Sequence, residues 1–403
     1  MIYLDSAATA PLLPCVKNAV SEILEKLARA EVGNASSLYS SGVYAKELIE
    51  TAREKVARFL DASPSEIIFT SGGSESNNTV LKTFENKSVA VSAIEHPSVL
   101  RPAEAYAKNL TLLPVDKTGR LDLNFLENFL EKTPAFPNLI SVMLANNELG
   151  VLEPITEVKK KLQRVLKLRK NPREKCPKFH SDLTQAVGKL PLSVKQLDLD
   201  YASFSAHKIG GPLGVGVLYI KSGSPYKPLL LGGEQENSRR AGTYNLPGIV
   251  GLGVACDYCF ENRTWEIYEK KVKPLRDSLA KSLLEKIPTA RLNTDLENSV
   301  PNILNLSFPA AEGESIQLYL DLNGVQVSTG SACASGSLEP SHVLMAIHHD
   351  PESAHNSIRF SLSLETSPAD LEKVIATLPK IVYNLQQIST IKLKEPKKCL
   401  TKK

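Results

Sequence analysis

Short apolar runs alternate with amphipathic stretches along the first two thirds of the chain. The runs are rich in β-branched and aromatic residues, which favours strands, whereas the stretches between them repeat apolar residues at helical spacing. This alternation predicts βαβ units and a mainly parallel sheet. The predicted strands are 66–70, 88–93, 139–144, 179–181, 201–205 and 214–220, and the predicted helices are 44–59, 75–84 and one containing Val158, Leu162, Val165 and Leu166.

The pattern changes after Thr264. A long charged helix is predicted over 264–287, and it leads to the apolar segments 303–308 and 358–363 with the small-residue segment 325–336 between them. This arrangement is typical of a second, smaller α+β domain. We therefore expect an α/β protein whose large domain spans 15–263 and whose small domain combines 1–14 with 264–403.

Composition is typical of a soluble globular protein, with 42% hydrophobic and 23% charged residues. No stretch is long and apolar enough to cross a bilayer. The N-terminal residues lack a basic segment and reach Asp5 almost at once, which argues against a secretory signal. Six cysteines among 403 residues do not make a disulfide framework. These features predict the cytoplasm, a reducing compartment.

Positive charge is concentrated in two segments on an otherwise acidic chain. Residues 159–178 hold ten Lys/Arg and one Glu, and residues 392–403 hold six Lys and one Glu. The favoured interpretation is a solvated helix face and a frayed tail. The alternative is a docking surface for an acidic partner or a nucleic acid. Nucleic acid is the weaker option because no aromatic residues are interleaved for base stacking.

Polar residues follow the predicted strands where each strand ends. In an open parallel sheet, ligands bind beyond the carboxyl ends of the strands, so these clusters predict one shared site. They are Ser71–Ser74, Glu95 with His96, Asn146–Glu148, Asp182 with Gln185, and His207 with Lys208.

One of these clusters could hold a phosphate group. Gly73 and Ser74 lie at the start of a predicted helix, where glycine permits close approach and the helix N-terminus favours an anion. Ser205 and His207 would add donors. The alternative is an ordinary N-cap with a flexible turn. No P-loop motif is present.

Pyridoxal phosphate is suggested by three features together: a candidate phosphate-binding site, a lysine among small and apolar residues, and a carboxylate at the end of a strand. The Lys208 amine would form an imine with the cofactor aldehyde. Asp182 would keep the ring nitrogen protonated, so that the ring accepts electrons. His96 would stack on the ring or move protons. Taken singly, Lys208 could also be a surface lysine and His96 a structural histidine.

The ordered motifs carry a family resemblance over nearly the whole chain. The chain resembles the cysteine desulfurases of the NifS/IscS type, which are class V aminotransferases within the fold-type I, aspartate aminotransferase-like pyridoxal phosphate enzymes. The resemblance implies a large domain with a mainly parallel seven-stranded sheet and a smaller α+β domain. Its motifs are YLDSAAT, GNASSLYSSG, IIFTSGGSESNN, EHPSVL, NNELGVLEPI, HSDLTQAVGKLP, SFSAHKIGGPLGVG, GGEQENSRRAGT, STGSACASGSLEPSHVL and SIRFSLS.

The resemblance implies a role for each candidate residue. Lys208 would bind the cofactor and move the substrate Cα proton, while His96 would stack on the ring and assist. Arg359 and Asn147 would bind the amino-acid substrate, since an arginine fork suits a carboxylate. The cofactor-binding set would be Gly73, Ser74, Asn147, Asp182 at the ring nitrogen, Gln185 at the phenolic oxygen, Ser205, His207, Lys208, and Thr243 reaching the phosphate in the other subunit of a homodimer.

Cys333 is the distinctive residue of the resemblance. Without it, Cys333 would be a packed cysteine among small residues. With it, Cys333 is the nucleophile that takes sulfur from L-cysteine, giving L-alanine and a persulfide. The sulfur would pass to an acceptor or scaffold protein for iron–sulfur clusters or to tRNA thiolation. No resident metal is expected, although Cys333 could contact a nascent cluster. Cys256 and Cys259 are interpreted as core rather than as a metal or redox pair.

Two other functions stay open at this point. A selenocysteine lyase shares the cofactor chemistry, and the long basic segment 159–178 favours it. A scaffold protein could keep the fold and act through its basic segments. The chain also departs from the family pattern, since Asn237 stands where an arginine is expected and Gly73-Ser74 stands where Ala-Thr or Gly-Thr is usual.

Overall fold

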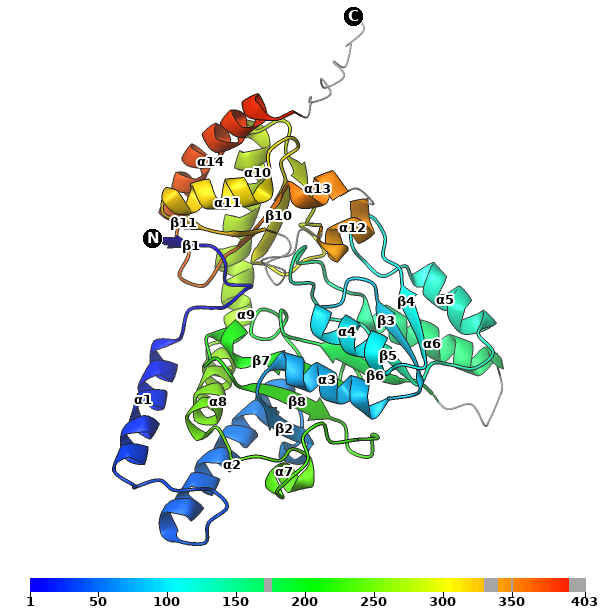
Figure 1. The fold of residues 1–403 in the computed structure, drawn as a ribbon, viewed down its shortest axis with the longest axis vertical. Helices are drawn as coiled ribbons and strands as arrows, with labels where there is room; N and C mark the ends of the chain where they lie inside the picture. Colours follow the sequence, from blue (N-terminus) through cyan, green and yellow to red (C-terminus); the bar gives the residue numbers. More distant parts are fainter. Residues whose placement is uncertain (170–175, 330–339, 349–350, 391–403) are drawn as a thin grey trace, which may run out of the picture.

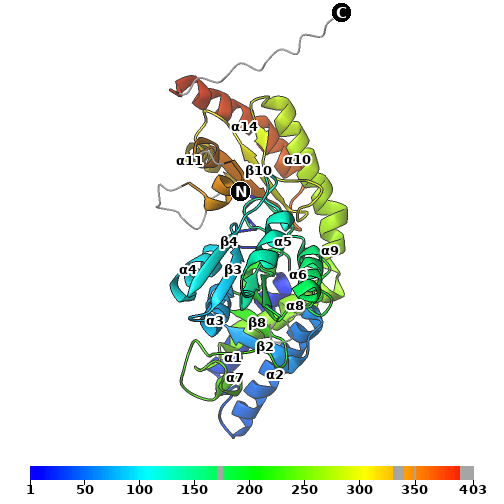
Figure 2. The ribbon, with the colours of Figure 1, turned by 90° about the vertical axis from the view of Figure 1, so that its right-hand side faces the viewer.

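The computed structural model of the protein describes residues 1–169, 176–329, 340–348 and 351–390. Figure 1 shows a larger body below a smaller one, and Figure 2 shows both along one elongated, curved molecule. The strands of the larger body are β2 (Ile67–Thr70), β3 (Ser88–Ser92), β4 (Asn109–Leu113), β5 (Leu139–Ser141), β6 (Lys178–Asp182), β7 (Tyr201–Ser205) and β8 (Gly216–Ile220).

The described strands of the larger body form one seven-stranded sheet in the order β2-β8-β7-β6-β5-β3-β4. Neighbours from β4 to β7 run parallel, while β8 runs antiparallel to both β7 and β2. The predicted mainly parallel sheet is therefore confirmed, and the carboxyl ends of all strands except β8 lie at one edge. All six predicted strands are present, but the run 139–144 is strand only to Ser141.

The sequence analysis missed strand β4. Only Leu113 of this strand is buried, because β4 lies at the edge of the sheet and forms ladder bonds with β3 alone. An edge strand buries too little apolar surface to show the pattern of a central strand.

Helices cover both faces of the sheet. Ile68 packs with Val80 and Val99 of α3 and α4, whereas its neighbours Ile67 and Phe69 join the core on the other face. This alternation follows from the two-residue period of a strand. The helices of the larger body are α1 (Pro14–Ala28), α2 (Ser40–Leu60), α3 (Gly73–Thr83), α4 (Pro97–Tyr106), α5 (Leu123–Lys132), α6 (Ile155–Arg169), α7 (Gln235–Ser238) and α8 (Leu246–Glu261).

The smaller body has an antiparallel sheet in the order β12-β13-β10-β9, and a separate parallel pair joins β1 to β11. Its strands are β1 (Ile2–Tyr3), β9 (Arg291–Leu292), β10 (Ile303–Ser307), β11 (Val325–Gln326), β12 (Ser328–Thr329) and β13 (Ser357–Ser361). Its helices are α9 (Thr264–Ile267), α10 (Lys273–Lys286), α11 (Gly313–Leu322), α12 (His342–His348), α13 (Pro351–His355) and α14 (Pro368–Ile388).

The long helix predicted over 264–287 is interrupted. A π-helical turn over Tyr268–Val272 separates α9 from α10. Pro274 lies at the start of α10, where it has no backbone N–H to donate to the preceding turn. The loss of that donor explains a local change of hydrogen-bond pattern within an otherwise continuous helix.

Each body has its own hydrophobic core. The largest core of the larger body contains residues from Val16 to Cys259, and the core of the smaller body combines Leu4 with residues from Tyr268 to Val382. The N-terminal strand therefore belongs with the C-terminal part of the chain. The exact domain boundaries at 14 and 264 stay a prediction.

Three of the described basic residues of α6 form ion pairs within the fold. Lys159 lies 3.0 Å from Asp198, and Lys161 and Arg164 both contact Glu127. This pairing supports the interpretation of a solvated helix face. Residues 170–175 and the basic tail 391–403 lie outside the described residues.

The four described cysteines, Cys15, Cys176, Cys256 and Cys259, are free thiols. Cys256 and Cys259 are buried in α8 within the main core, as expected for core residues. Within the described ranges, no helix has both the length and the apolar character of a membrane span.

Glu153 gives a pH-dependent test of the fold. Burial raises the pKa of its carboxyl to about 8, although Oε2 accepts a hydrogen bond from the Leu121 amide. The folded state therefore binds a proton more tightly than the unfolded chain, and this residue's contribution to stability falls as pH rises from about 4.5 to 8. Glu153→Gln keeps an acceptor for the Leu121 amide but has no ionisable group. We therefore expect the stability of this variant not to show the decrease with pH that Glu153 causes.

The measurement is the free energy of unfolding in urea at pH 5.5 and 8.5 for both proteins. The stability of the variant relative to wild type should rise by about 3 kcal/mol between these pH values. Parallel pH dependence of the two proteins would mean that Glu153 is ionised normally in the fold.

Candidate active site

A cavity of about 290 Å³ lies at the carboxyl ends of the parallel strands. It collects residues from both bodies, because the N-terminal segment and β13 close it from the side of the smaller body. The predicted site residues that line it are Gly73, Ser74, His96, Asn147, Asp182, Gln185, Ser205, His207, Lys208 and Arg359. These residues, grouped from the strand ends, line one cavity, and their roles stay a prediction.

The predicted phosphate-binding site lies where α3 begins. The Gly73 amide donates to Ser205 Oγ at 2.6 Å, which joins the start of α3 to the end of β7. A Cβ at Gly73 would lie 3.0 Å from Ser205 Oγ and 3.3 Å from Thr184 Oγ1, so only glycine allows this approach without displacement. The amides of the first turn of α3 point out of the helix toward an anion.

Lys208 follows β7 on a short 3₁₀ turn, Ala206–Ile209. Its Nζ donates to the backbone carbonyls of Ala7 at 2.7 Å and Ala8 at 2.6 Å. Gly210 ends the turn with φ of 74°, a conformation that favours glycine. The N-terminal segment therefore holds the amine at the cavity wall, a role that the YLDSAAT motif did not reveal.

Asp182 is held by donors that the sequence analysis did not single out. Its Oδ2 accepts from Asn77 Nδ2 at 2.8 Å, and its Oδ1 accepts from the Thr184 amide at 2.9 Å. Asn77 also donates to Ser98 Oγ at 2.9 Å. Asn77 lies one helical turn after Ser74 on α3, so its position in the motif TSGGSESNN was the available signal.

The ring of His96 is oriented by a hydrogen bond at the start of α4. It caps α4, and its Nδ1 accepts from the Ser98 amide at 3.1 Å, which leaves the proton on Nε2. Burial lowers the pKa of His96, with Asp182 opposing that effect. Burial and the Lys208 charge likewise lower the pKa of His207 to about 4, while its Nδ1 contacts Thr9 Oγ1 at 3.1 Å.

Gln185 is held against the N-terminal segment by one of its two amide N–H donors. Its Nε2 donates to the Ala7 carbonyl at 2.9 Å, and its Oε1 is buried with no partner among the described residues. The same carbonyl also accepts from Lys208. The second N–H of Nε2 is the donor left for the predicted contact to a phenolic oxygen, and that contact stays a prediction.

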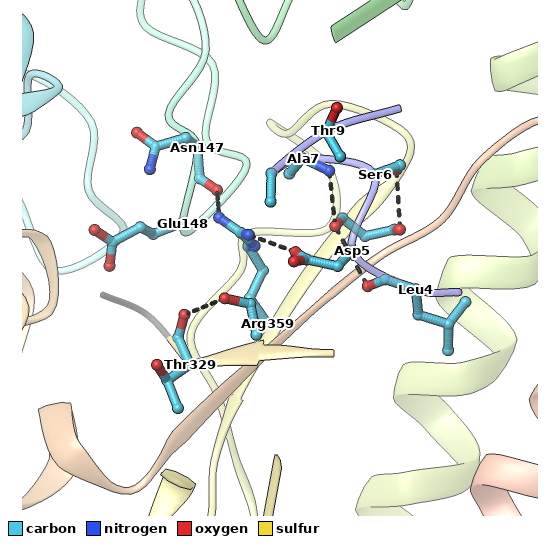
Figure 3. Close-up of polar contacts among 12 residues, drawn as sticks. Leu4, Asp5, Ser6, Ala7, Thr9, Asn147, Glu148, Thr329 and Arg359 are labelled. Atoms are coloured by element: carbon cyan, nitrogen blue, oxygen red, sulfur yellow. Dashed lines mark hydrogen bonds and ion pairs between the residues drawn. The ribbon is translucent and has the colours of Figure 1, made fainter. Parts of the chain in front are cut away.

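Arg359 is already engaged on both terminal nitrogens, as Figure 3 shows. Nη2 forms an ion pair with Asp5 at 2.6 Å, and Nη1 donates to the Asn147 carbonyl at 2.9 Å. The Nε atom is buried without a partner among the described residues. A substrate carboxylate would therefore meet a guanidinium whose orientation Asp5 and Asn147 have already set.

Glu148 and Ser341 form a further contact near the cavity. Ser341 Oγ donates to Glu148 Oε2 at 2.5 Å, and burial raises the pKa of Glu148 to about 7. This contact fixes the start of α12 to the loop that carries Asn147. Cys333 lies in 330–339, outside the described residues, so its position is not part of this geometry.

Thr243 is the one described candidate that does not line the cavity. It lies beside a second pocket with Ser71 and Arg240. The preceding residues Glu236, Asn237 and Ser238 all have positive φ. Asparagine tolerates that conformation better than arginine does, which gives a structural reason for Asn237. The buried ion pair between Glu236 and Arg53, at 2.7 Å, holds this strained turn.

The residues of the cavity fit pyridoxal phosphate. The set contains an amine for the aldehyde, a carboxylate for the ring nitrogen and a glycine cradle at a helix N-terminus for the phosphate. The unpartnered Oε1 of Gln185 also leaves one side chain of the wall able to rearrange around a ligand. No cluster of metal-ligating residues is found among the described residues.

Comparison with known proteins agrees with this geometry. The family model for class-V aminotransferases matches residues 2–374. The chain is 43% identical over 400 residues to a cysteine desulfurase IscS of Dictyoglomus turgidum, covering 97% of each chain. It also resembles the structure of a NifS-like protein from Rickettsia africae, with 35% identity and a TM-score of 0.84 over 95% of this chain and 99% of that one.

A third relative, SspA, was solved in complex with cysteine; it is 28% identical, with a TM-score of 0.71 over 90% of this chain and 99% of that chain. The family match covers most of the chain, and the relatives are matched over nearly their whole length. The protein therefore belongs to the class-V aminotransferase family.

Proposed function

We propose that the protein is a pyridoxal-phosphate-dependent cysteine desulfurase that forms L-alanine from L-cysteine and delivers the sulfur for iron–sulfur clusters. The observation that carries this proposal is the single cavity that unites Lys208, Asp182, His96 and Arg359. The relatives named cysteine desulfurase match both sequence and length. Pyridoxal phosphate, when bound, supplies an electron sink for a bond broken at the substrate Cα.

The side chains of the cavity have separate tasks in this reaction. Arg359 binds the substrate carboxylate, with Asn147 beside it. Lys208 removes or returns the Cα proton, and His96 can donate one from Nε2. Asp182, whose carboxylate is oriented by Asn77 and Thr184, would hold the ring nitrogen of the cofactor in its protonated form.

Cys333 performs the sulfur transfer. Its thiolate attacks the sulfur of the substrate, so that an S–S bond forms and the substrate C–S bond breaks. The electron pair of the broken bond stays with carbon, which takes up a proton to become the methyl group of alanine. The persulfide on Cys333 then passes its outer sulfur to an acceptor thiol.

Replacing Cys333 tests this proposal. We expect Cys333→Ala to lose persulfide formation and to lower alanine release from L-cysteine by about 10²-fold or more, because the nucleophile is absent. The matched control is Cys176→Ala, since Cys176 is exposed and remote in sequence. Wild-type rates of alanine and persulfide formation in the Cys333 variant would overturn the assignment of Cys333.

Cysteine is the favoured substrate over selenocysteine. The relatives that match the whole chain are named cysteine desulfurases, and SspA was solved with cysteine. Several described residues of the basic segment that favoured a lyase, such as Lys159 and Lys161, form ion pairs within the fold. A strong kinetic preference for selenocysteine, with cysteine barely cleaved, would favour the lyase instead.

The assembly and location are also part of this proposal. A homodimer would place Thr243 of one subunit at the phosphate of the other, which agrees with its exposure outside the cavity of its own chain. The free thiols of the described cysteines fit the cytoplasm. The partner would be a sulfur acceptor or an iron–sulfur scaffold protein.

A further inference from the structure

Lys189 is a buried lysine behind the catalytic lysine. It ends the turn that follows β6, and only 2% of its surface is exposed. It lines another cavity, separate from the active-site cavity and from the pocket beside Thr243. The walls of this cavity also come from the N-terminal segment, the end of α8 and residues 363–365. Lys208 lines both this cavity and the active-site cavity, so the turn of Lys208 forms the wall between them.

Few hydrogen bonds or opposite charges compensate the Lys189 amine for its burial. Its one described hydrogen bond goes from Nζ to the backbone carbonyl of Lys208, and that bond is long at 3.5 Å. No carboxylate of the described residues lies within ion-pair distance of it. Buried lysines are ordinarily paired, because an isolated ammonium loses its hydration without replacement.

The charged group that acts most on Lys189 is the Lys208 amine. Burial and the charge of Lys208 lower the pKa of Lys189 to about 7, while Cys259 acts in the opposite direction. The Lys189 charge also contributes to the lowered pKa of His207. The other titratable groups that line this cavity are Lys208 on the 3₁₀ turn, Tyr258 and Cys259 on α8, Tyr268 on the π-helical turn, and Glu365 after β13. His207, beside Lys208, also interacts with the Lys189 charge.

We propose that Lys189 is a positioning residue for Lys208, which binds the Lys208 carbonyl and whose charge is coupled to that of the Lys208 amine across the wall of the shared cavity. Two ammonium groups in one desolvated region repel each other, so a proton on Lys189 disfavours a proton on Lys208. A lysine beside a second cationic group is more easily kept as the neutral nucleophile. The proposal rests on the role proposed above for Lys208.

The test compares Lys189→Met with Lys189→Arg in the full-length chain without cofactor. Acetic anhydride labels neutral amines, and mass spectrometry of peptides gives the labelling rate of Lys208 at each pH. The arginine keeps a permanent charge beside Lys208, whereas the methionine removes it. We expect the midpoint of Lys208 labelling to be about one pH unit lower in the Arg variant than in the Met variant, with the wild type between them.

The opposite direction of the two shifts separates charge coupling from a structural effect. Lys195→Met is the matched control, because Lys195 is exposed and paired with Asp61, and it should leave the midpoint unchanged. Equal midpoints in the two Lys189 variants, or shifts in the same direction, would overturn the proposal. In the wild type alone, the Lys208 titration should be broader than that of one amine, and a single-site curve would also contradict coupling.

This experiment needs neither cofactor nor turnover, so its result is independent of the proposed desulfurase activity. After loading with pyridoxal phosphate, the pH midpoint of its visible absorbance should shift in the same directions in the two variants. Unchanged absorbance midpoints in both would contradict the proposal for the loaded protein.

Discussion

Replacement of Lys208 by alanine is expected to reduce alanine formation from L-cysteine by about 10⁴-fold, because one residue supplies both the cofactor bond and the proton transfer. The fold should tolerate the change. Lys208 is only partly buried, and its Nζ bonds two carbonyls of the N-terminal segment rather than a buried charge. The measurement is steady-state alanine release with saturating pyridoxal phosphate.

Lys195→Ala is the control for this prediction, since it removes an exposed lysine from the same stretch of chain. It should keep wild-type activity. A Lys208 variant that retained a substantial part of the wild-type rate would show that another amine performs the reaction, or that the activity comes from a different site.

Replacement of Arg359 by alanine is expected to raise the KM for L-cysteine and to lower kcat/KM by about 10²- to 10³-fold, which corresponds to the loss of a charge-assisted carboxylate contact in a buried site. The guanidinium is 2% exposed and lies in the cavity wall. The effect should fall mainly on KM, since Arg359 does not contact the reacting carbon. Initial rates over a range of cysteine concentrations separate the two constants.

Asp5→Asn is the informative partner of that variant. It removes the ion pair at 2.6 Å but leaves Arg359 and its bond to the Asn147 carbonyl in place. We expect a smaller loss, about tenfold or less in kcat/KM, because the guanidinium is less firmly oriented. An Arg359→Ala enzyme with an unchanged KM would remove Arg359 from the substrate site.

The sequence was sufficient to predict the sheet and the edge at which the site lies. Central strands such as 201–205 are buried on both faces, so their composition identifies them directly. The polar residues that follow β3, β5, β6 and β7 could then be grouped, because parallel strands bring their carboxyl ends together. The roles of individual residues came from the family resemblance rather than from these patterns.

The contacts that hold the site together could not be predicted in the same way. Asp5 and Arg359 are separated by 354 positions, and nothing in the local pattern of either segment indicates the other. The Ala7 carbonyl accepts from both Lys208 and Gln185. Because it is a backbone group, the residue type at position 7 does not indicate this role. Lys189 looks like an ordinary polar residue until its burial is known.

The central claim is that Lys208 is the amine that binds pyridoxal phosphate in the cavity at the strand ends. Borohydride reduction of the loaded protein followed by peptide mass spectrometry tests it most directly, because reduction fixes the cofactor on the lysine that holds it. We predict one modified peptide, carrying the cofactor mass on Lys208. Modification of another lysine such as Lys189, or an unmodified Lys208 peptide after reduction, would contradict it.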